Sequence, residues 1–176
     1  MIALRSALPA DVPALAALGR DSFAAKFGHL YRDEDLLPFL EGTFSEDAIR
    51  AELADPHRLY RLAESADGTS HGTLAGYCKL GLVSGWPDHA HGQRPIELKQ
   101  LYTAPDMIGQ GIGAALMQWA LDEARARGAD EMQLSVWSGN LGAQKFYARY
   151  GFAKVADVHF MVGQQRDHEF LFARML

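Results

Sequence analysis

The spacing of hydrophobic and polar residues changes period along the chain, and this change separates predicted strands from predicted helices. Alternation with a period of two, typical of strands, marks residues 2–8, 57–65, 72–83, 96–104, 131–137, 152–160 and 169–176. Helical spacing marks 9–27, with Asp11 as its cap, then 112–127 and 141–150; residues 31–56 fit one or two short helices, the second capped by Ser45. Within 96–104, the alternation sets Glu97, Lys99 and Leu101 on one face and Ile96, Leu98 and Gln100 on the other.

The order of these elements mixes strands and helices without strict alternation. It predicts an α/β fold in which helices flank a mixed, largely antiparallel sheet, with a hairpin turn at 66–72. The chain has 176 residues, enough to bury one core, so we expect a single domain over 1–176. Cys78 lies in a strand pattern, and we expect a buried core residue rather than a nucleophile.

The charge balance narrows the class of partner. Lysine and arginine total 17 against 22 aspartates and glutamates, so the basic footprint of a nucleic-acid-binding protein is missing and a cationic substrate is tolerated. Charges and prolines interrupt the apolar N-terminal stretch, so we expect no signal peptide, no membrane association and a cytoplasmic protein. His89 and His91 lie in a loop without partner ligands, and the single cysteine forms no metal knuckle, so we predict no metal site.

A glycine-rich stretch, PDMIGQGIGAAL (105–116), precedes the helical pattern that starts near Ile112. Gly109, Gly111 and Gly113 occupy every second position in it. Glycines that open a helix typically let an anion approach backbone N–H groups at the positive end of the helix dipole. The stretch fits a nucleotide phosphate, a dinucleotide or the diphosphate of coenzyme A; a ligand-free glycine turn is a weaker alternative because glycine has an entropic cost.

Two of these interpretations conflict with nearby residues. A P-loop ends in Gly-Lys-Ser/Thr, but the equivalent place here is Gly-Ala-Ala. A dinucleotide fingerprint is met in its spacing, with an acid about twenty residues on at Asp130 or Glu131, yet these acids begin the next predicted strand instead of ending it. The third interpretation is a coenzyme A cradle made of the N–H groups of residues 109–114, and it meets no such conflict.

Two blocks of the sequence resemble the GNAT superfamily of N-acetyltransferases. The first, LKQLYTAPDMIGQGIGAALM (98–117), resembles the family's strand, Arg/Gln-x-x-Gly-x-Gly/Ala loop and helix, with Ile108 where the family prefers Arg or Gln. The second, SVWSGNLGAQKFYARYGFAKV (135–155), resembles the family's Asn-x-x-Ala-x-x-Phe-Tyr-x-x-x-Gly-Phe block. The resemblance covers most of the chain, and segments such as FAAKFGHLY and IELKQLY look like the PaiA-type spermidine/spermine acetyltransferases.

This resemblance implies a fold, a co-substrate and roles for named residues. It implies the GNAT fold, with a six- to seven-stranded sheet whose central strands splay apart, and acetyl-CoA as the acetyl donor. The N–H of Leu101 would polarise the thioester, Tyr147 would protonate the departing sulfur, and Asn140 would bind the pantetheine arm. The implied cofactor-binding set is Leu101, Tyr102, Thr103, Gly109, Gln110, Gly111, Ile112, Gly113, Ala114, Asn140, Ala143, Phe146 and Tyr147.

Structural alternatives stand beside three of these roles. Asn140 is also placed to cap the 141–150 helix, and Tyr147 also suits a core position. The base is a choice between Glu97, on the strand that leads to Leu101, and a water chain; Glu97 is equally well explained as an exposed strand acid paired with Lys99.

The acceptor implied by the resemblance is a primary amine, with a polyamine such as spermidine or spermine as the first candidate. An acidic segment at 31–55 and three aromatic residues would suit an alkylammonium chain, although the acids also fit a solvated helix face and the aromatic residues a core: Phe23, Tyr31 and Trp137. Alternative acceptors are an amino-acid derivative, an antibiotic and a protein N-terminus or lysine. A catalytically idle coenzyme A sensor is the alternative from another class, and a homodimer is compatible with the sequence.

Overall fold

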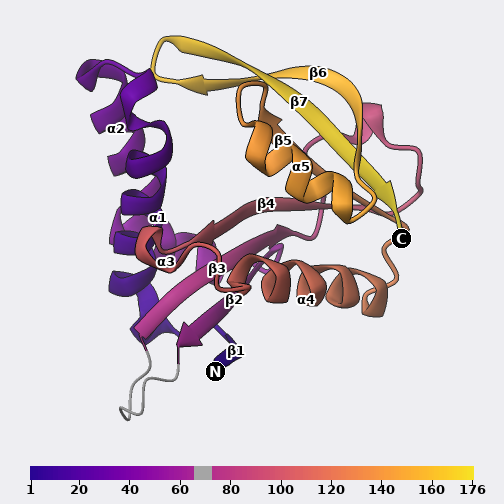
Figure 1. The fold of residues 1–176 in the computed structure, drawn as a ribbon, viewed down its shortest axis with the longest axis horizontal. Helices are drawn as coiled ribbons and strands as arrows, with labels where there is room; N and C mark the ends of the chain where they lie inside the picture. Colours follow the sequence, from indigo (N-terminus) through magenta and orange to yellow (C-terminus); the bar gives the residue numbers. More distant parts are fainter. Residues whose placement is uncertain (66–72) are drawn as a thin grey trace.

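One sheet of seven strands runs through residues 1–65 and 73–176, which the computed structural model describes (Figure 1). Its strand order is β1-β2-β3-β4-β5-β7-β6, with β1 (Ile2–Ser6), β2 (Arg58–Ser65), β3 (Thr73–Gly81), β4 (Pro95–Thr103), β5 (Glu131–Trp137), β6 (Ala153–Val162) and β7 (Gln165–Met175). The α-helices are α1 (Val12–Phe27), α2 (Asp33–Phe44), α3 (Glu46–Ala54), α4 (Ile112–Ala126) and α5 (Leu141–Arg149). Neighbouring strands are antiparallel except for β4 and β5, which confirms the predicted mixed sheet. The turn predicted at 66–72 lies outside the described residues.

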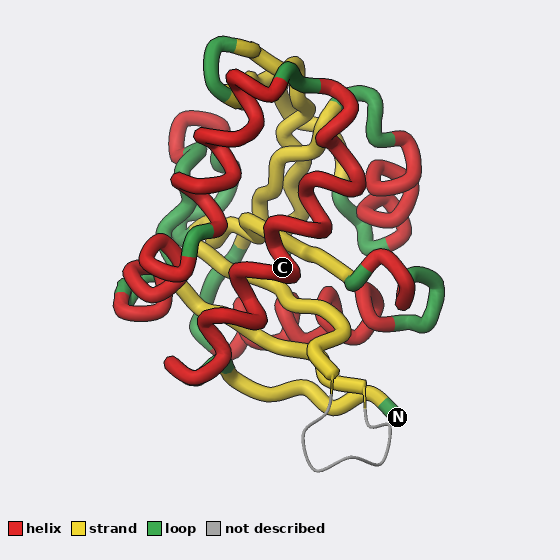
Figure 2. The backbone as a smooth tube through the Cα atoms, turned by 90° about the vertical axis from the view of Figure 1, so that its left-hand side faces the viewer, coloured by secondary structure: helices red, strands yellow, loops and turns green. Residues whose placement is uncertain are grey.

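Helices stand on both sides of the sheet (Figure 2). On one side, which we call the α4 face, Leu116 of α4 packs in a buried cluster with Leu98 of β4 and Leu134 of β5. On the other side, the α1 face, Leu15 of α1 packs with Tyr77 of β3. The strands therefore alternate between two cores, as a sheet covered on both faces requires.

Several local predictions are confirmed. Ser45 caps α3 by accepting a hydrogen bond from the N–H of Ala48 at 3.2 Å. Cys78 is fully buried, and desolvation raises the pKa of its thiol to about 12, so it is not a reactive nucleophile. The closing pair of strands is longer than predicted, because β6 and β7 are joined by a tight turn in which Gly163 has a φ of 57°.

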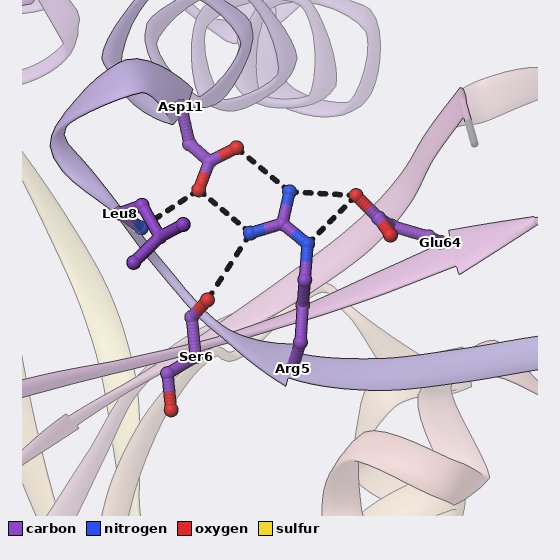
Figure 3. A network of polar contacts seen from close by, with 5 residues as sticks. All are labelled: Arg5, Ser6, Leu8, Asp11 and Glu64. Atoms are coloured by element: carbon purple, nitrogen blue, oxygen red, sulfur yellow. Dashed lines mark hydrogen bonds and ion pairs between the residues drawn. The ribbon is translucent and has the colours of Figure 1, made fainter. Parts of the chain in front are cut away.

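One arginine ties the start of α1 to the sheet (Figure 3). The guanidinium of Arg5, on β1, donates to Asp11 at 2.7 Å and to Glu64 of β2 at 2.6 and 2.8 Å. Asp11 also accepts from the N–H of Leu8 at 2.7 Å. Asp11 is the N-cap residue of α1, as predicted, but its side chain makes no capping hydrogen bond, since Arg5 and Leu8 take up its carboxylate.

A β-bulge in the β3–β4 pair changes which residues of β4 share a face. The register shifts so that Lys99 becomes the extra residue on β4. Beyond the bulge, Gln100 lies on the α1 face, where it accepts a hydrogen bond from the Tyr77 hydroxyl at 2.9 Å. Leu101 packs against the α4-face core instead. The predicted alternation is therefore wrong from Gln100 onward, and Glu97 and Leu101 lie on opposite faces.

Candidate active site

The central strands β4 and β5 pair only near their N-terminal ends. Their parallel ladder joins 95–97 to 131–133 and stops at the pair Glu97–Gln133. Beyond that pair, among the described residues, 98–103 have no ladder partner on the β5 side, so the splay implied by the resemblance is present. We call the paired stretch the closed end of the β4–β5 seam and the separated stretch its open end.

The backbone N–H and C=O groups of two β4 residues point into the open end. The N–H of Ala104 donates to the carbonyl of Ala75 on β3 at 2.8 Å, so these two residues form a hydrogen-bonded pair. Hydrogen-bonded and non-hydrogen-bonded pairs alternate along an antiparallel ladder. Leu101 and Thr103 therefore occupy positions whose N–H and C=O groups point away from β3. This arrangement suits the two predicted roles, pairing with a strand-like ligand and an N–H aimed at a thioester carbonyl.

The glycine loop is open at the N-terminus of α4. Gly109 and Gly111 have φ values of 87° and 81°, a left-handed conformation that favours glycine. Gly111 is the N-cap residue of α4, and a Cβ added at Gly109 or Gly111 would meet no atom within 4 Å. The loop is not shaped by packing against the protein, and the free N–H groups of the first helical turn remain accessible. These features fit the diphosphate of coenzyme A.

A cavity of about 820 Å³ connects the open end, the glycine loop and α5. Most of the predicted cofactor-binding residues line it: Leu101, Tyr102, Thr103, Gly109, Gly111, Ile112, Gly113, Ala114, Ala143, Phe146 and Tyr147. Gln110 and Asn140 are not among its lining residues. The wall also contains Ile108, the loop position where the family prefers Arg or Gln, and residues that no sequence pattern singled out for this role: Ser22, Ala25, Lys26, Pro105, Gly142 and Arg149.

Two cationic side chains in this wall suit an anionic ligand. Lys26 lies in the last turn of α1, and desolvation lowers the pKa of its ammonium group. Arg149 lies in the last turn of α5, with its guanidinium 5.6 Å from the centre of the Phe146 ring. Cations near helix C-termini are common because they complement the helix dipole, which is why the sequence contains no distinctive signal for either.

Tyr147 both packs against the core and faces the cavity. Its ring centre lies 5.5 Å from that of Phe146 and 6.1 Å from that of Phe152, both in edge-on contacts. Desolvation raises the pKa of its phenol to about 12, so the hydroxyl keeps its proton at neutral pH. A protonated phenol at a cavity wall is able to donate to a leaving group.

Asn140 is the N-cap of α5, one of its two predicted roles. Its side-chain oxygen accepts a hydrogen bond from the N–H of Ala143 at 3.1 Å. Its contact with pantetheine stays a prediction.

Glu97 lies at the closed end of the seam. Its carboxylate accepts from the N–H of Gly85 at 3.0 Å and pairs with the ammonium group of Lys99 at 3.1 Å. The predicted pairing with Lys99 is present, but Glu97 is buried rather than exposed. It does not line the cavity, and its role as a base stays a prediction.

Asp130 and Glu131, the two acids at the spacing of a dinucleotide fingerprint, accept hydrogen bonds from a loop instead. Glu131 accepts hydrogen bonds from the N–H groups of 91 and 92 at 2.7 and 2.6 Å. Asp130 accepts from those of 93 and 94, each at 2.8 Å.

Across residues 1–65 and 73–176, no three histidine, cysteine, aspartate or glutamate side chains form a group able to hold a metal ion. In the same described residues, no helix has the length and apolar character needed to cross a membrane.

The acidic segment 31–55 has fewer free carboxylates for an alkylammonium chain than its sequence indicates. Asp35 is buried and accepts a hydrogen bond from the N–H of Gln164 at 2.7 Å, which secures the β6–β7 turn. Arginine or lysine partners lie within 4 Å of five of its other acids: Glu34, Glu41, Glu46, Asp47 and Glu52. Among the aromatic candidates, Phe23 belongs to the core.

Known proteins resemble this chain in sequence and in structure. The profile of the Acetyltransferase (GNAT) family matches residues 25–152. An uncharacterized N-acetyltransferase of Lactobacillus delbrueckii subsp. lactis is 28% identical over 166 residues, 94% of this chain and 92% of the relative. The aminoalkylphosphonate N-acetyltransferase of Salmonella typhimurium is 36% identical over 107 residues, 60% of this chain and 64% of the relative.

Among solved structures, the PaiA N-acetyltransferase of Thermoplasma acidophilum in complex with coenzyme A superposes with a TM-score of 0.79 at 20% identity, over 100% of this chain and 99% of that chain. At this identity the likeness concerns the fold, and it confirms the predicted GNAT architecture with its splayed central strands. The family profile covers more than half of the chain, and it is this match that identifies the N-acetyltransferase activity. The chain belongs to the Acetyltransferase (GNAT) family and is an acetyl-CoA-dependent N-acetyltransferase.

Proposed function

We propose that the protein acetylates a primary amine of a polyamine such as spermidine or spermine, with Tyr147 as the general acid. A pair of carboxylates on β7, Asp167 and Glu169, supports this choice of acceptor. The two residues lie on the α1 face, beside the end of β5. In the part of the chain that the structure describes, no lysine or arginine forms an ion pair with either.

Aromatic side chains border these carboxylates. The Tyr31 hydroxyl donates to Asp167, which is buried. Trp137 pairs with Glu169 across β5 and β7 and therefore shares its face. The Trp137 ring also meets the Phe27 ring of α1 edge-on, with 6.4 Å between their centres. Negative groups beside aromatic rings attract and hold alkylammonium chains.

The Salmonella relative points to a second acceptor class, an aminoalkylphosphonate. An acceptor that carries a phosphonate needs a cation near its amine site, because an isolated anion is costly to desolvate. Asp167 and Glu169 would repel such a group. The same argument applies to an amino-acid carboxylate, so a polycationic acceptor fits this region better.

In the proposed reaction, two groups of the chain act on a bound thioester. Acetyl-CoA, when bound, supplies the carbonyl carbon that the amine attacks. The N–H of Leu101 stabilises the negative charge that develops on the carbonyl oxygen. The Tyr147 hydroxyl donates a proton to the sulfur as it leaves. Burial keeps Tyr147 protonated, with a pKa of about 12, so this donor is available throughout the neutral range.

The test is thiol release from acetyl-CoA with a panel of amines, for the wild type and Tyr147→Phe. Spermidine and spermine should give the highest kcat/KM, ahead of aminoalkylphosphonates and amino acids. Tyr147→Phe should lower kcat by roughly 100-fold, the usual contribution of a general acid. Its Kd for coenzyme A, measured by calorimetry, should change less than about twofold because the aromatic wall is kept.

Tyr150→Phe is the matched control, since Tyr150 packs 5.1 Å from Phe146 but does not line the cavity. It should keep the wild-type kcat. Unchanged thiol release by Tyr147→Phe would show that the acid assignment is wrong. Release with another amine but not with polyamines would overturn the acceptor assignment alone.

A further inference from the structure

Glu169 lies beside the open end of the seam, at the level of the predicted oxyanion donor. It pairs with Trp137, the last residue of β5. Continuing the β4–β5 register beyond the Glu97–Gln133 pair, with Lys99 as the extra residue of the bulge, brings the Leu101–Tyr102 stretch about level with Trp137. Glu169 therefore stands across the open end from the part of β4 that has lost its β5 partner.

Four segments of the chain bring polar groups near the Glu169 carboxylate. Tyr102 of β4 and Tyr31, which follows α1, lie close enough for its charge to act on their phenols. Ser135 of β5 lies diagonal to Glu169 across the β5–β7 pair and shares its face, and Asp167 is the nearest acid on β7. Among the described residues, no cationic side chain pairs with Glu169. The carboxylate is partly buried and lacks a neutralising partner.

Tyr102 links this carboxylate to the cavity. Tyr102 and Tyr147 both line the cavity, and the charge of Glu169 acts on the Tyr102 phenol. The proposed acid and the Glu169 carboxylate therefore approach the same residue. An amine that enters between them meets a proton acceptor and a proton donor at one place.

The surroundings make Glu169 a stronger base than an exposed glutamate. Burial raises the pKa of its carboxyl group, the charge of Asp167 raises it further, and the contact with Ser135 opposes the change. A simple alkylammonium has a pKa of about 10, so a raised carboxyl pKa narrows the gap that proton transfer must cross.

We propose that Glu169 is the general base of the reaction and takes a proton from the ammonium group of the acceptor. The proposal rests on the proposed function, because it requires an amine that enters as a cation. It assigns the proton acceptor to β7 rather than to the β4 carboxylate at Glu97.

The proposed acetyl transfer is balanced in protons and electrons. The ammonium group gives one proton to Glu169 and becomes a neutral amine, whose lone pair forms the C–N bond with the thioester carbon. The C–S bond breaks, and its electron pair leaves on the sulfur, which takes a proton from Tyr147. The nitrogen loses its second proton to the Tyr147 phenolate, and Glu169 releases its own to solvent. Each turnover yields an acetamide, a thiol and one free proton.

Glu97 is the rival carboxylate; neither it nor Glu169 is a lining residue of the cavity, and the two differ in their partners and in their place along the seam. Its oxygen is already engaged by Gly85 and Lys99 at 3.0 and 3.1 Å. It lies where β4 and β5 are still paired. A carboxylate held by a cation is a weaker base, since the cation stabilises its ionised form.

The experiment measures the pH dependence of kcat and KM for the wild type and for Glu169→Gln. Thiol release is the readout, and the amine is spermidine or the fastest amine of the panel. For the wild type, kcat/KM should fall as pH falls through the pKa of Glu169, since only the ionised carboxylate accepts a proton. Glu169→Gln should lose roughly 100-fold or more near neutral pH, mainly in kcat. The deficit should shrink as the pH approaches about 10, where the amine loses its proton unaided.

Two variants control for structure. Glu123→Gln changes an acid on the outside of α4 that pairs with Arg127 at 2.7 Å, and it should keep the wild-type profile. The Kd of Glu169→Gln for coenzyme A should match the wild type and show that the fold is kept. If the Gln variant does not fold, Glu169→Asp decides: a displaced carboxylate should lower kcat about tenfold and retain the acidic limb, and an unchanged kcat would overturn the assignment.

Three results count against Glu169 while leaving the acetyltransferase function intact. The first is a wild-type pH profile for Glu169→Gln. The second is a raised KM with unchanged kcat, which would make Glu169 a binding group only. The third is transfer of the pH-dependent loss to Glu97→Gln. If the wild type releases no thiol with any amine, the proposed function fails, and the base assignment fails with it.

Discussion

The closed and open ends of the β4–β5 seam consist of the same two strands, yet their polar groups differ in what they meet. At the closed end, Glu97 and Glu131 accept hydrogen bonds from backbone N–H groups of the loop 84–94. At the open end, the backbone groups of Leu101 have no partner on β5, and no cation of the described chain pairs with Glu169. Apart from Glu131 Oε1, which is buried without a hydrogen-bond partner, the acids of the closed end are held by the loop as in a structural site, whereas the open end has the free groups of a reactive one.

The contrast shows that residue type does not distinguish the two ends. Both ends have carboxylates on their strands. Glu97, the acid predicted as a base, lies at the closed end. The loop 84–94 makes the difference, because it covers one end of the seam only. Changes at the closed end should therefore reduce stability and spare coenzyme A binding, whereas changes at the open end and its glycine loop should weaken coenzyme A binding.

Glu131→Ala should have the largest effect. The substitution leaves two partly buried hydrogen bonds, from the N–H groups of residues 91 and 92, without their acceptor. Each unsatisfied donor costs about 1–3 kcal/mol, so the free energy of unfolding should fall by about 3 kcal/mol. Urea unfolding followed by circular dichroism measures the loss, and calorimetry of the folded variant should give the wild-type Kd for coenzyme A.

Glu131→Gln separates the hydrogen bonds from the charge. It keeps the shape and one acceptor oxygen, so it should lose less than half as much stability as the alanine variant. A Kd for coenzyme A that weakens in parallel with the loss of stability would mean that the two ends are coupled, and the comparison between them would fail.

Gly111→Ala should have the next largest effect, now on binding. Alanine at a φ of 81° is strained by roughly 1–2 kcal/mol, and the loop should relax away from the geometry that presents its N–H groups. We expect the Kd for coenzyme A to rise about tenfold, a change of about 1.4 kcal/mol. Isothermal titration calorimetry measures it directly.

Gly128→Ala is the matched control at the other end of α4. Gly128 has a φ of 76°, so the strain is similar, but it follows the helix and does not line the cavity. It should lose a similar amount of stability and keep the wild-type Kd. Equal weakening of coenzyme A binding by both glycine variants would attribute the effect to general destabilisation.

The sequence predicts the elements and the cofactor loop because both depend on local patterns. Helical and strand periods identify the elements, and the glycines at 109 and 111 allow the positive φ that the loop adopts there. The β-bulge at Lys99 has no such pattern, since it depends on pairing with β3. It reverses the faces of the residues that follow and so places Leu101 opposite Glu97.

The acceptor side is the part that sequence alone predicts least. Glu169 stands fourteen residues beyond the second block that resembles the GNAT superfamily, which ends at residue 155. Only the β5–β7 pairing brings it next to Trp137 and the open end. Conversely, Asp35 belongs to an acidic run that resembles a binding surface, but it is buried where it secures the β6–β7 turn. Both outcomes depend on contacts between segments far apart in the chain.

Ile108 should give the smallest effect and test whether side chains contribute to the cradle. It lines the cavity with 72% of its surface exposed, so a longer polar side chain has room there. Ile108→Arg should lower the Kd for coenzyme A about threefold, and the gain should shrink at high salt because exposed ion pairs are screened. Ile108→Gln should give a smaller gain that salt does not remove, since it adds a hydrogen bond without charge. Gln93→Arg, which adds the same charge at the closed end, should leave the Kd unchanged. An unaltered Kd for both Ile108 variants would mean that backbone N–H groups alone hold the diphosphate, and that the open end selects its ligand without loop side chains.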